Sequence, residues 1–289
     1  MTESDLAGKW LVETGWLAEH LQSPDIVIVD ANWYLPNDPR DPKAEYLEAR
    51  IPGAVYFDID EISDKSNPLP HMLPSPEQFS SQMRKLGIGD GMRIIVYDAQ
   101  GMFSAPRAWW TFRTMGVDDV AVLNGGLAKW KAEERPLEDG PPAPRGQRHF
   151  TARRNMDFVR DRDDILAIST NGSAQILDAR SAARFRGEAP EPREGLRSGH
   201  VPGSLNLPYA DLLNDDGTLK PAKELEKLFK DAGVDFSRPV ATTCGSGVTA
   251  SILTLALNLL GHRHVSVYDG SWSEWGADDS LPIDTGPGS

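Results

Sequence analysis

The chain has 289 residues, 39% of them hydrophobic and 25% charged, a balance typical of globular proteins. Its formal net charge of −13 argues against nucleic acid or an anionic membrane surface as a partner. No apolar stretch approaches the roughly 18 residues that span a bilayer, and residues 1–10 lack the basic and apolar regions of a signal peptide. Because the chain also contains a single cysteine, we expect a cytoplasmic protein in a reducing compartment.

The two halves of the chain carry similar landmarks in the same order, which indicates a tandem duplication. The matching segments are 26–31 with 174–179, 51–54 with 201–204, 93–97 with 238–242, and 123–130 with 268–275. The run 140–146 reads Gly-Pro-Pro-Ala-Pro-Arg-Gly, a composition that suits a stiff linker. We therefore predict two domains, 1–145 and 146–289.

Short β-like runs alternate with helix-like runs in each half, and the second half shows this most clearly. We expect strands near 174–178, 204–207, 239–243 and 264–268, and helices near 160–170, 222–232, 248–260 and 271–275. This alternation predicts an α/β fold in which each domain is a parallel sheet with helices on both faces. Ligands of such sheets bind at the carboxyl ends of the strands.

Cys244 lies directly after the apolar run 239–243 and opens the sequence Cys-Gly-Ser-Gly-Val-Thr-Ala over 244–250. A glycine-spaced loop between a strand and a helix directs backbone N–H groups at the sulfur and favours the reactive thiolate. The first half has Ala99 at the aligned position, so we take the second half as the working copy. The alternative is a buried structural cysteine.

Two other kinds of cysteine enzyme can be compared with this loop. A cysteine phosphatase needs an arginine six positions after the cysteine, where this chain has Ala250, and no Lys or Arg occurs from 239 to 262. A cysteine protease would need a nearby histidine, and residue spacing alone leaves that alternative open.

The cysteine loop, the degenerate first copy and the terminal motif 269–275 together resemble the two-domain sulfurtransferases of the rhodanese superfamily. The resemblance covers about 25–282 and includes the segments 103–110 and 199–203. It implies two tandem rhodanese-like domains. Family members that use thiosulfate carry Arg and Lys after the cysteine, whereas the Gly-Ser sequence here resembles that of members that use 3-mercaptopyruvate. A neutral loop also suits a donor whose charge lies away from the transferred sulfur.

Five arginines follow the 174–178 strand, namely Arg180, Arg184, Arg186, Arg193 and Arg197. They may be compared with the acidic residues Glu188, Glu191 and Glu194, whose charges would pair with them on a solvated loop. The resemblance implies instead that Arg184 and Arg193 hold the carboxylate and keto groups of the substrate, with Arg186 as a weaker candidate. Arginine suits this role because its planar fork binds two oxygens.

The resemblance also groups Ser246 with His71 and Asp60 of the first half. An Asp–His–Ser relay of this kind would deliver a proton as sulfur leaves the substrate. The alternative is that Asp60 caps a local turn and that His71 bonds loop carbonyls.

The expected reaction is transfer of sulfur from 3-mercaptopyruvate through a Cys244 persulfide, with release of pyruvate. Thioredoxin, glutathione or cyanide would accept the sulfur. No metal or cofactor is implied, and the histidines show no metal-ligand spacing. The alternatives are a thiosulfate:cyanide sulfurtransferase and a non-catalytic persulfide carrier. The backbone groups expected to hold the anionic sulfur belong to Gly245, Gly247, Val248 and Thr249.

Overall fold

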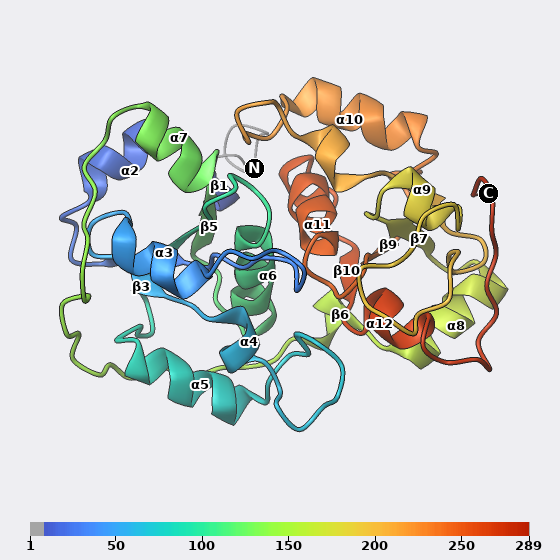
Figure 1. Cartoon of the computed structure of the whole chain (residues 1–289), viewed down its shortest axis with the longest axis horizontal. Helices are drawn as coiled ribbons and strands as arrows, with labels where there is room; N and C mark the ends of the chain where they lie inside the picture. Colours follow the sequence, from blue (N-terminus) through green and yellow to red (C-terminus); the bar gives the residue numbers. More distant parts are fainter. Residues whose placement is uncertain (1–8, 289) are drawn as a thin grey trace. The chain divides into compact units, whose positions relative to one another are not determined.

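The computed structural model describes residues 9–288, which form two compact units. The N-terminal unit contains the described residues up to Lys65 together with Leu73–Asn155 and Asn214–Leu219. The C-terminal unit contains Ser66–Met72, Met156–Leu213 and the described residues from Lys220 onward. Each unit thus includes a short segment from the opposite half of the sequence. Figure 1 colours the elements of both units along the chain.

The N-terminal unit is built on a five-stranded parallel sheet in the order β1-β5-β4-β2-β3. Its strands are β1 (Leu11–Val12), β2 (Ile26–Asp30), β3 (Val55–Tyr56), β4 (Arg93–Tyr97) and β5 (Val120–Leu123). Its helices are α2 (Thr14–His20), α3 (Pro42–Glu48), α4 (Ile59–Ile62), α5 (Pro76–Lys85), α6 (Ala105–Thr114) and α7 (Gly126–Ala132).

The C-terminal unit repeats this plan with the strand order β6-β10-β9-β7-β8, again all parallel. Its strands are β6 (Val159–Arg160), β7 (Gln175–Asp178), β8 (Leu205–Asn206), β9 (Val240–Thr243) and β10 (Val265–Tyr268). Its helices are η1 (Met156–Phe158), α8 (Arg162–Asn171), α9 (Ala182–Phe185), η2 (Tyr209–Leu212), α10 (Ala222–Asp231), α11 (Ala250–Leu259) and α12 (Ser271–Trp275). The matching strand orders confirm the predicted duplication and the predicted α/β fold.

The buried elements explain the apolar runs of the sequence. All four residues of β9 are buried, as a parallel strand covered on both faces requires. All ten residues of α11 are buried as well, so this helix is covered on every side. A core cluster that includes Ile176, Ala241, Trp272 and Trp275 fills the space between sheet and helices.

The predicted strands and helices of the second half agree with the observed ones within two residues at nearly every end. The edge strand β6, the four-residue helix α9 and the two 3-10 turns were not predicted. Each of these has four residues or fewer, which is too short for a hydrophobic period to appear.

The strand register determines which residues meet at the carboxyl edge of the C-terminal sheet. Thr243 of β9 pairs with Asp178 of β7, and the Ala179 N–H donates to the Thr243 carbonyl at 2.9 Å. Cys244 and the residues that follow Asp178 therefore leave the sheet side by side. This places the cysteine loop next to the arginine-rich segment of the sequence.

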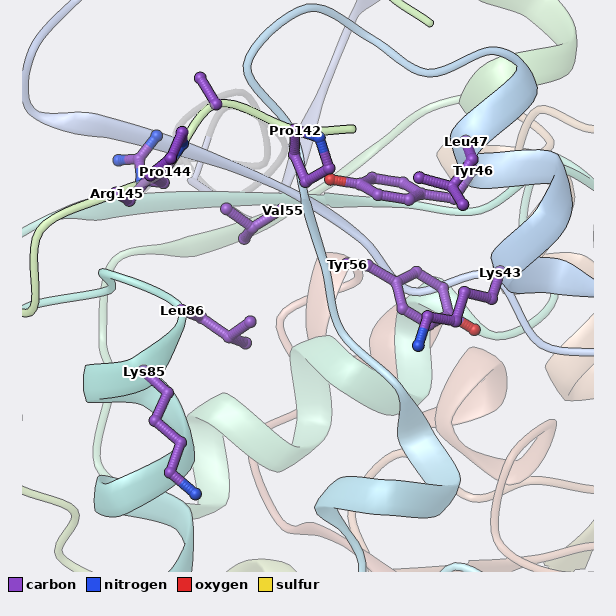
Figure 2. Close-up of a pocket in the computed structure, with 11 residues that line it drawn as sticks. Lys43, Tyr46, Leu47, Val55, Tyr56, Lys85, Leu86, Pro142, Pro144 and Arg145 are labelled. Carbon is purple, nitrogen blue, oxygen red and sulfur yellow. The ribbon is translucent and has the colours of Figure 1, made fainter. Parts of the chain in front are cut away.

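The proline-rich segment packs on the N-terminal unit. The buried Arg50 donates to the Gly140 carbonyl at 2.6 Å and to Glu138 at 2.5 Å. Pro142 lies beside the Tyr46 ring at a cavity of about 320 Å³, which α3, β3, the end of α5 and this segment enclose (Figure 2). The segment thus folds back on the first repeat. Within residues 9–288, no helix is long and apolar enough to cross a membrane.

Candidate active site

Cys244 is the first residue after β9, and its side chain is buried. The loop that it opens runs through Thr249 to the start of α11. Helix α12 fixes the beginning of this loop: the Trp272 N–H donates to the Cys244 carbonyl at 2.9 Å, and the Cys244 N–H donates to Ser271 Oγ at 3.3 Å. Both the N–H group and the carbonyl group of Cys244 are therefore hydrogen-bonded.

Ser273 supports the next residue of the loop. Its N–H and its hydroxyl both donate to the Gly245 carbonyl, at 2.8 and 2.7 Å. Sequence reasoning did not identify Ser271 or Ser273, because a serine without a nearby base carries no chemical signature. Their positions directly after β10, the strand beside β9, were the available signal.

The loop leaves several backbone donors without protein acceptors. Across the described chain, the N–H groups of Gly245, Ser246, Val248 and Thr249 make no hydrogen bond to another residue. Gly247 adopts a φ of 77°, in the left-handed region that favours glycine. Thr249, the N-cap of α11, gives no side-chain cap to the helix. Donors of this kind at a helix start stabilise an anion.

The N-terminal unit shows what the equivalent loop does when it carries a carboxylate. The Leu127 N–H donates to the Asp98 carbonyl at 2.9 Å, just as Trp272 donates to Cys244. Asp98, and not Ala99, is therefore the counterpart of Cys244, so the alignment expected from the sequence was wrong by one position. The loop before α6 is one residue longer than the loop before α11, which the sequence comparison could not detect.

The carboxyl group of Asp98 accepts hydrogen bonds from the backbone of this loop. Its Oδ2 accepts the N–H groups of Phe103, Ser104 and Ala105 at 2.8 to 2.9 Å, and its Oδ1 accepts that of Gln100 at 2.9 Å. Burial raises the pKa of Asp98 although these four hydrogen bonds act to lower it. The same fold thus binds an anion at this point in one repeat, and Cys244 stands there in the other.

Two arginines lie against the loop. A Cβ atom added at Gly245 would lie 3.2 Å from Nη2 of Arg184 and 3.9 Å from Nη1 of Arg193. The absence of a side chain at Gly245 thus leaves room for Arg184 to lie close to the residue after Cys244. These are the two arginines that the family resemblance selects.

The other three arginines have different surroundings. Arg180 is buried, bonds Asp178 through Nε and Nη2, and stacks on the Trp272 ring. Arg197 donates to four backbone carbonyls near the end of the chain, and Arg186 pairs with Glu188 at the surface. Arg186, the weaker candidate for substrate binding, therefore forms a solvated ion pair with Glu188.

Glu191 links the buried arginine to the loop. Its two oxygens accept from Arg180 at 2.8 Å and from Arg184 at 2.5 Å. Nε of Arg184 is also buried, and among the described residues it has no hydrogen-bond partner. Arg184 is therefore oriented by one carboxylate and retains a donor for a second one.

His71 belongs to the C-terminal unit through the segment Ser66–Met72. It is buried, and its Nε2 lies 3.2 Å from Nη2 of Arg193. Because a guanidinium only donates, Nε2 of His71 is the acceptor in this contact. His71 thus contacts one of the two arginines that lie against the cysteine loop.

The remaining residues of the predicted relay lie as follows. Ser246 is buried within the cysteine loop. Asp60 belongs to the N-terminal unit, where it is exposed in the first turn of α4 and accepts from Trp33 Nε1 at 3.0 Å. Asp58, not Asp60, caps that helix. Among residues 9–288, no three His, Cys, Asp or Glu side chains are grouped so that they could hold a metal ion.

Comparison with known proteins gives a consistent result. The family model described as rhodanese-like domain matches residues 13–133 and 161–278. A 3-mercaptopyruvate sulfurtransferase of Escherichia coli K12 is 48% identical over 277 residues, 95% of this chain and 98% of the relative. Its human counterpart is 42% identical over 92% of this chain and 91% of the relative. The crystal structure of SseA from Escherichia coli, described as a 3-mercaptopyruvate sulfotransferase, superposes with a TM-score of 0.84 at 46% identity over 91% and 99% of the two chains.

Proposed function

We propose that this chain, which belongs to the rhodanese-like domain family, is a sulfurtransferase enzyme that takes sulfur from 3-mercaptopyruvate. Two relatives at 42% and 48% identity bear the name of that activity. The observation that carries the proposal is that Arg184 and Arg193 both lie against Gly245, the residue after Cys244. A sulfur nucleophile beside two guanidinium groups suits a substrate that carries a thiol and a carboxylate.

The arginines orient the substrate in this proposal. Arg184 is held by Glu191 and keeps a buried Nε donor for a carboxylate oxygen. Arg193 binds the keto oxygen, and the contact with His71 at 3.2 Å keeps its guanidinium directed toward the loop. Two fixed cations also bring the substrate to the sulfur in one orientation, which lowers the entropic cost of attack.

The Cys244 thiolate then attacks the thiol sulfur of 3-mercaptopyruvate. An S–S bond forms, the C–S bond breaks, and its electron pair moves onto pyruvate as the enolate. Arg193 stabilises the charge on the enolate oxygen, and a proton delivered through Ser246 completes pyruvate. His71 and Asp60 complete the proposed relay. Cys244 is left as a persulfide, whose outer sulfur the N–H groups of 245–249 stabilise.

An acceptor removes the outer sulfur in the second half-reaction. A thiolate attacks it, the S–S bond breaks, and the Cys244 thiolate is regenerated. We propose a dithiol of the thioredoxin type, glutathione or cyanide as acceptors. The buried sulfur supports a small or extended acceptor, because the side chain of Cys244 is only 2% exposed.

The same site supports thiosulfate less well as a donor. Thiosulfate is a compact dianion, and the loop 245–249 contributes no charged side chain to it. The ratio of kcat/KM for the two donors separates these activities. A non-catalytic persulfide carrier would have no use for Arg184 and Arg193, since it binds no carboxylate.

The decisive experiment is intact-protein mass spectrometry after brief incubation with 3-mercaptopyruvate, and separately with thiosulfate. We expect a mass gain of one sulfur atom with 3-mercaptopyruvate on the wild-type chain and none on Cys244→Ser. Efficient loading by thiosulfate alone would favour the alternative donor. No gain with either donor would support the carrier and contradict the proposed enzyme.

We also propose a cytoplasmic location and a domain boundary near residue 145. The single cysteine supports the cytoplasmic location, because free thiols persist in reducing compartments. A domain boundary near residue 145 is supported by the composition of 140–146 and lies within the stretch between the two family matches.

A further inference from the structure

The two repeats differ at the residue two positions after a shared aspartate. In the C-terminal unit, Asp178 ends β7 and is followed by Ala179 and Arg180. In the N-terminal unit, Asp30 ends β2 and is followed by Ala31 and Asn32. A long cationic side chain in one repeat thus corresponds to a short neutral one in the other.

Arg180 is buried at the end of β7, and its guanidinium has several partners there. Its guanidinium donates to Asp178 at 2.7 Å, to Glu191 at 2.8 Å and to the Gly199 carbonyl at 2.8 Å. It lies 4.1 Å from the centre of the Trp272 ring and is 1% exposed. The carboxylate at the end of β7 is therefore neutralised by a cation of its own chain.

The N-terminal repeat has no counterpart of the Arg180 guanidinium or of the Trp272 ring. Asn32 replaces the arginine, and Leu127 is the counterpart of Trp272, since each donates its N–H to the residue that opens the loop. A cavity of about 190 Å³ lies here, and Asp30, Asn32 and Leu127 all line it. The cavity occupies the carboxyl end of β2, which is where parallel α/β sheets bind ligands.

In the described part of the chain, one buried acceptor of this cavity lacks a donor, and the buried carboxyl group of Asp30 lacks a cationic partner. Asn32 is 2% exposed, and within residues 9–288 its Oδ1 has no hydrogen-bond partner. Asp30 is also 2% exposed; its carboxyl group accepts the Asn32 N–H at 2.9 Å and a hydrogen bond from Tyr97, but among residues 9–288 it forms no ion pair. A buried acceptor without a donor costs free energy, which a bound donor would recover.

The charges around the cavity favour a cation. Its lining includes the carboxyl groups of Asp30, Glu45 and Glu48, against the cations of Arg40 and Lys131. Both oxygens of Glu45 are already bonded to Arg40, at 2.6 and 2.7 Å. Without the Glu45–Arg40 pair, the lining contains the carboxyl groups of Asp30 and Glu48 and one cation, Lys131.

We propose that this cavity, defined by Asp30, Asn32 and Leu127, binds a small organic cation that presents a guanidinium or primary ammonium group. The ligand places its N–H donors on Asp30 and on Oδ1 of Asn32, where the guanidinium of Arg180 would lie in the other repeat. Its remaining apolar atoms lie against Leu127. The N-terminal unit is thereby a ligand site, although its loop carries Asp98 instead of a cysteine.

The test uses the full-length chain and two probes of nearly the same shape, methylguanidinium and neutral methylurea. Ligand-observed NMR follows the methyl signal of each probe during titration with protein at pH 7, and methylammonium serves as a third probe. We expect methylguanidinium to bind about tenfold more tightly than methylurea, because a charged donor on a buried carboxylate is the stronger pair.

Three variants locate the binding. Asn32→Arg supplies the missing guanidinium within the chain and should abolish binding of methylguanidinium. Asp30→Asn keeps the shape of the side chain, removes its charge and should weaken binding about tenfold. Lys131→Gln removes the opposing cation and should strengthen binding about threefold. Thermal melting of each variant verifies that it is folded.

The opposite results would overturn the proposal. Equal binding of methylguanidinium and methylurea would show that charge is not recognised, and weaker binding by Lys131→Gln would indicate an anion site. Unchanged binding by Asp30→Asn would place the probe elsewhere, even if Asn32→Arg failed to fold. Failure of both cationic probes to bind the wild-type chain would exclude the site.

Discussion

Nε2 of His71 and Nη2 of Arg193 lie 3.2 Å apart, and His71 holds this position with a φ of 62°. A residue other than glycine in the left-handed region stores about 1 kcal/mol or more of strain, which persists where the surroundings fix it. The buried ring of His71 thus contacts the guanidinium of Arg193 from a left-handed backbone conformation.

Substitution of His71 should separate orientation from proton transfer. His71→Gln offers an amide oxygen to Arg193, whereas His71→Ala offers nothing. If orientation dominates, we expect KM for 3-mercaptopyruvate to rise roughly tenfold in His71→Ala and much less in His71→Gln, with kcat nearly constant. Equal and large losses of kcat in both variants would instead support the relay through Ser246.

Gly245→Ala should impair substrate binding without unfolding the chain. The added Cβ would lie 3.2 Å from Arg184 Nη2, so the guanidinium must move by a few tenths of an ångström. We expect KM for 3-mercaptopyruvate to rise roughly fivefold. Gly146→Ala is the matched control, because nothing lies within 4 Å of its Cβ position. Equal kinetics of the two variants would contradict the proposed role of Arg184.

The double variant Gly245→Arg with Ser246→Lys tests the charge of the loop. It introduces the two cations that thiosulfate enzymes carry, and the new arginine also crowds Arg184. We expect the preference, measured as the ratio of kcat/KM values, to move toward thiosulfate while activity with 3-mercaptopyruvate falls. An unchanged ratio would show that loop charge does not select the donor.

Ser273→Ala tests the support beneath the loop. Its hydroxyl donates to the Gly245 carbonyl at 2.7 Å. Loss of this bond should lower the free energy of unfolding by about 1 kcal/mol and should also lower kcat. In the control Ser280→Ala, an exposed hydroxyl that bonds Asp278 is removed, and both quantities should stay near wild type. A kcat effect of equal size in both variants would argue against a specific support.

Asp30 should make stability depend on pH. Burial raises its pKa from 3.8 to about 7, with Tyr97 donating to it and Asp98 and Glu45 nearby. The folded state therefore binds a proton that the unfolded state has lost, and Asp30 destabilises the fold progressively as pH rises from about 4 to 7. We expect the Tm of Asp30→Asn to exceed that of the wild type by more at pH 8 than at pH 5. The same Tm difference at both pH values would contradict this ionisation.

Much of the fold was predictable because hydrophobic patterning and repetition act over many residues. The strands around Ile176 and Ala241 appear in the sequence as apolar runs, and similar runs occur in the same order in the first half. The edge strand β6 has two residues and owes its place to the neighbouring strand β10. Pairing of that kind is a property of the assembled sheet, so no local pattern reveals it.

The sequence identifies candidate residues for the site but not the residues that support them. Cys244 and its glycine-spaced loop stand out in the sequence, and the resemblance selected Arg184 and Arg193 from five arginines. The bond of Glu191 to two of those arginines depends on how the loop closes, which charge patterns do not encode. The counterpart of Cys244 was misplaced because a one-residue difference between loops becomes visible only through hydrogen bonds at both ends.

Each unit includes a short segment from the opposite half of the chain, so a single cut cannot separate the two units. Ser66–Met72 counts with the C-terminal unit and Asn214–Leu219 with the N-terminal one. A cut at the proline-rich segment would leave each half without residues that complete it, including His71 on one side and Gly217, which packs on Gly101, on the other. Deletion of the first repeat at the proline-rich segment would therefore also remove residues that belong to the C-terminal unit.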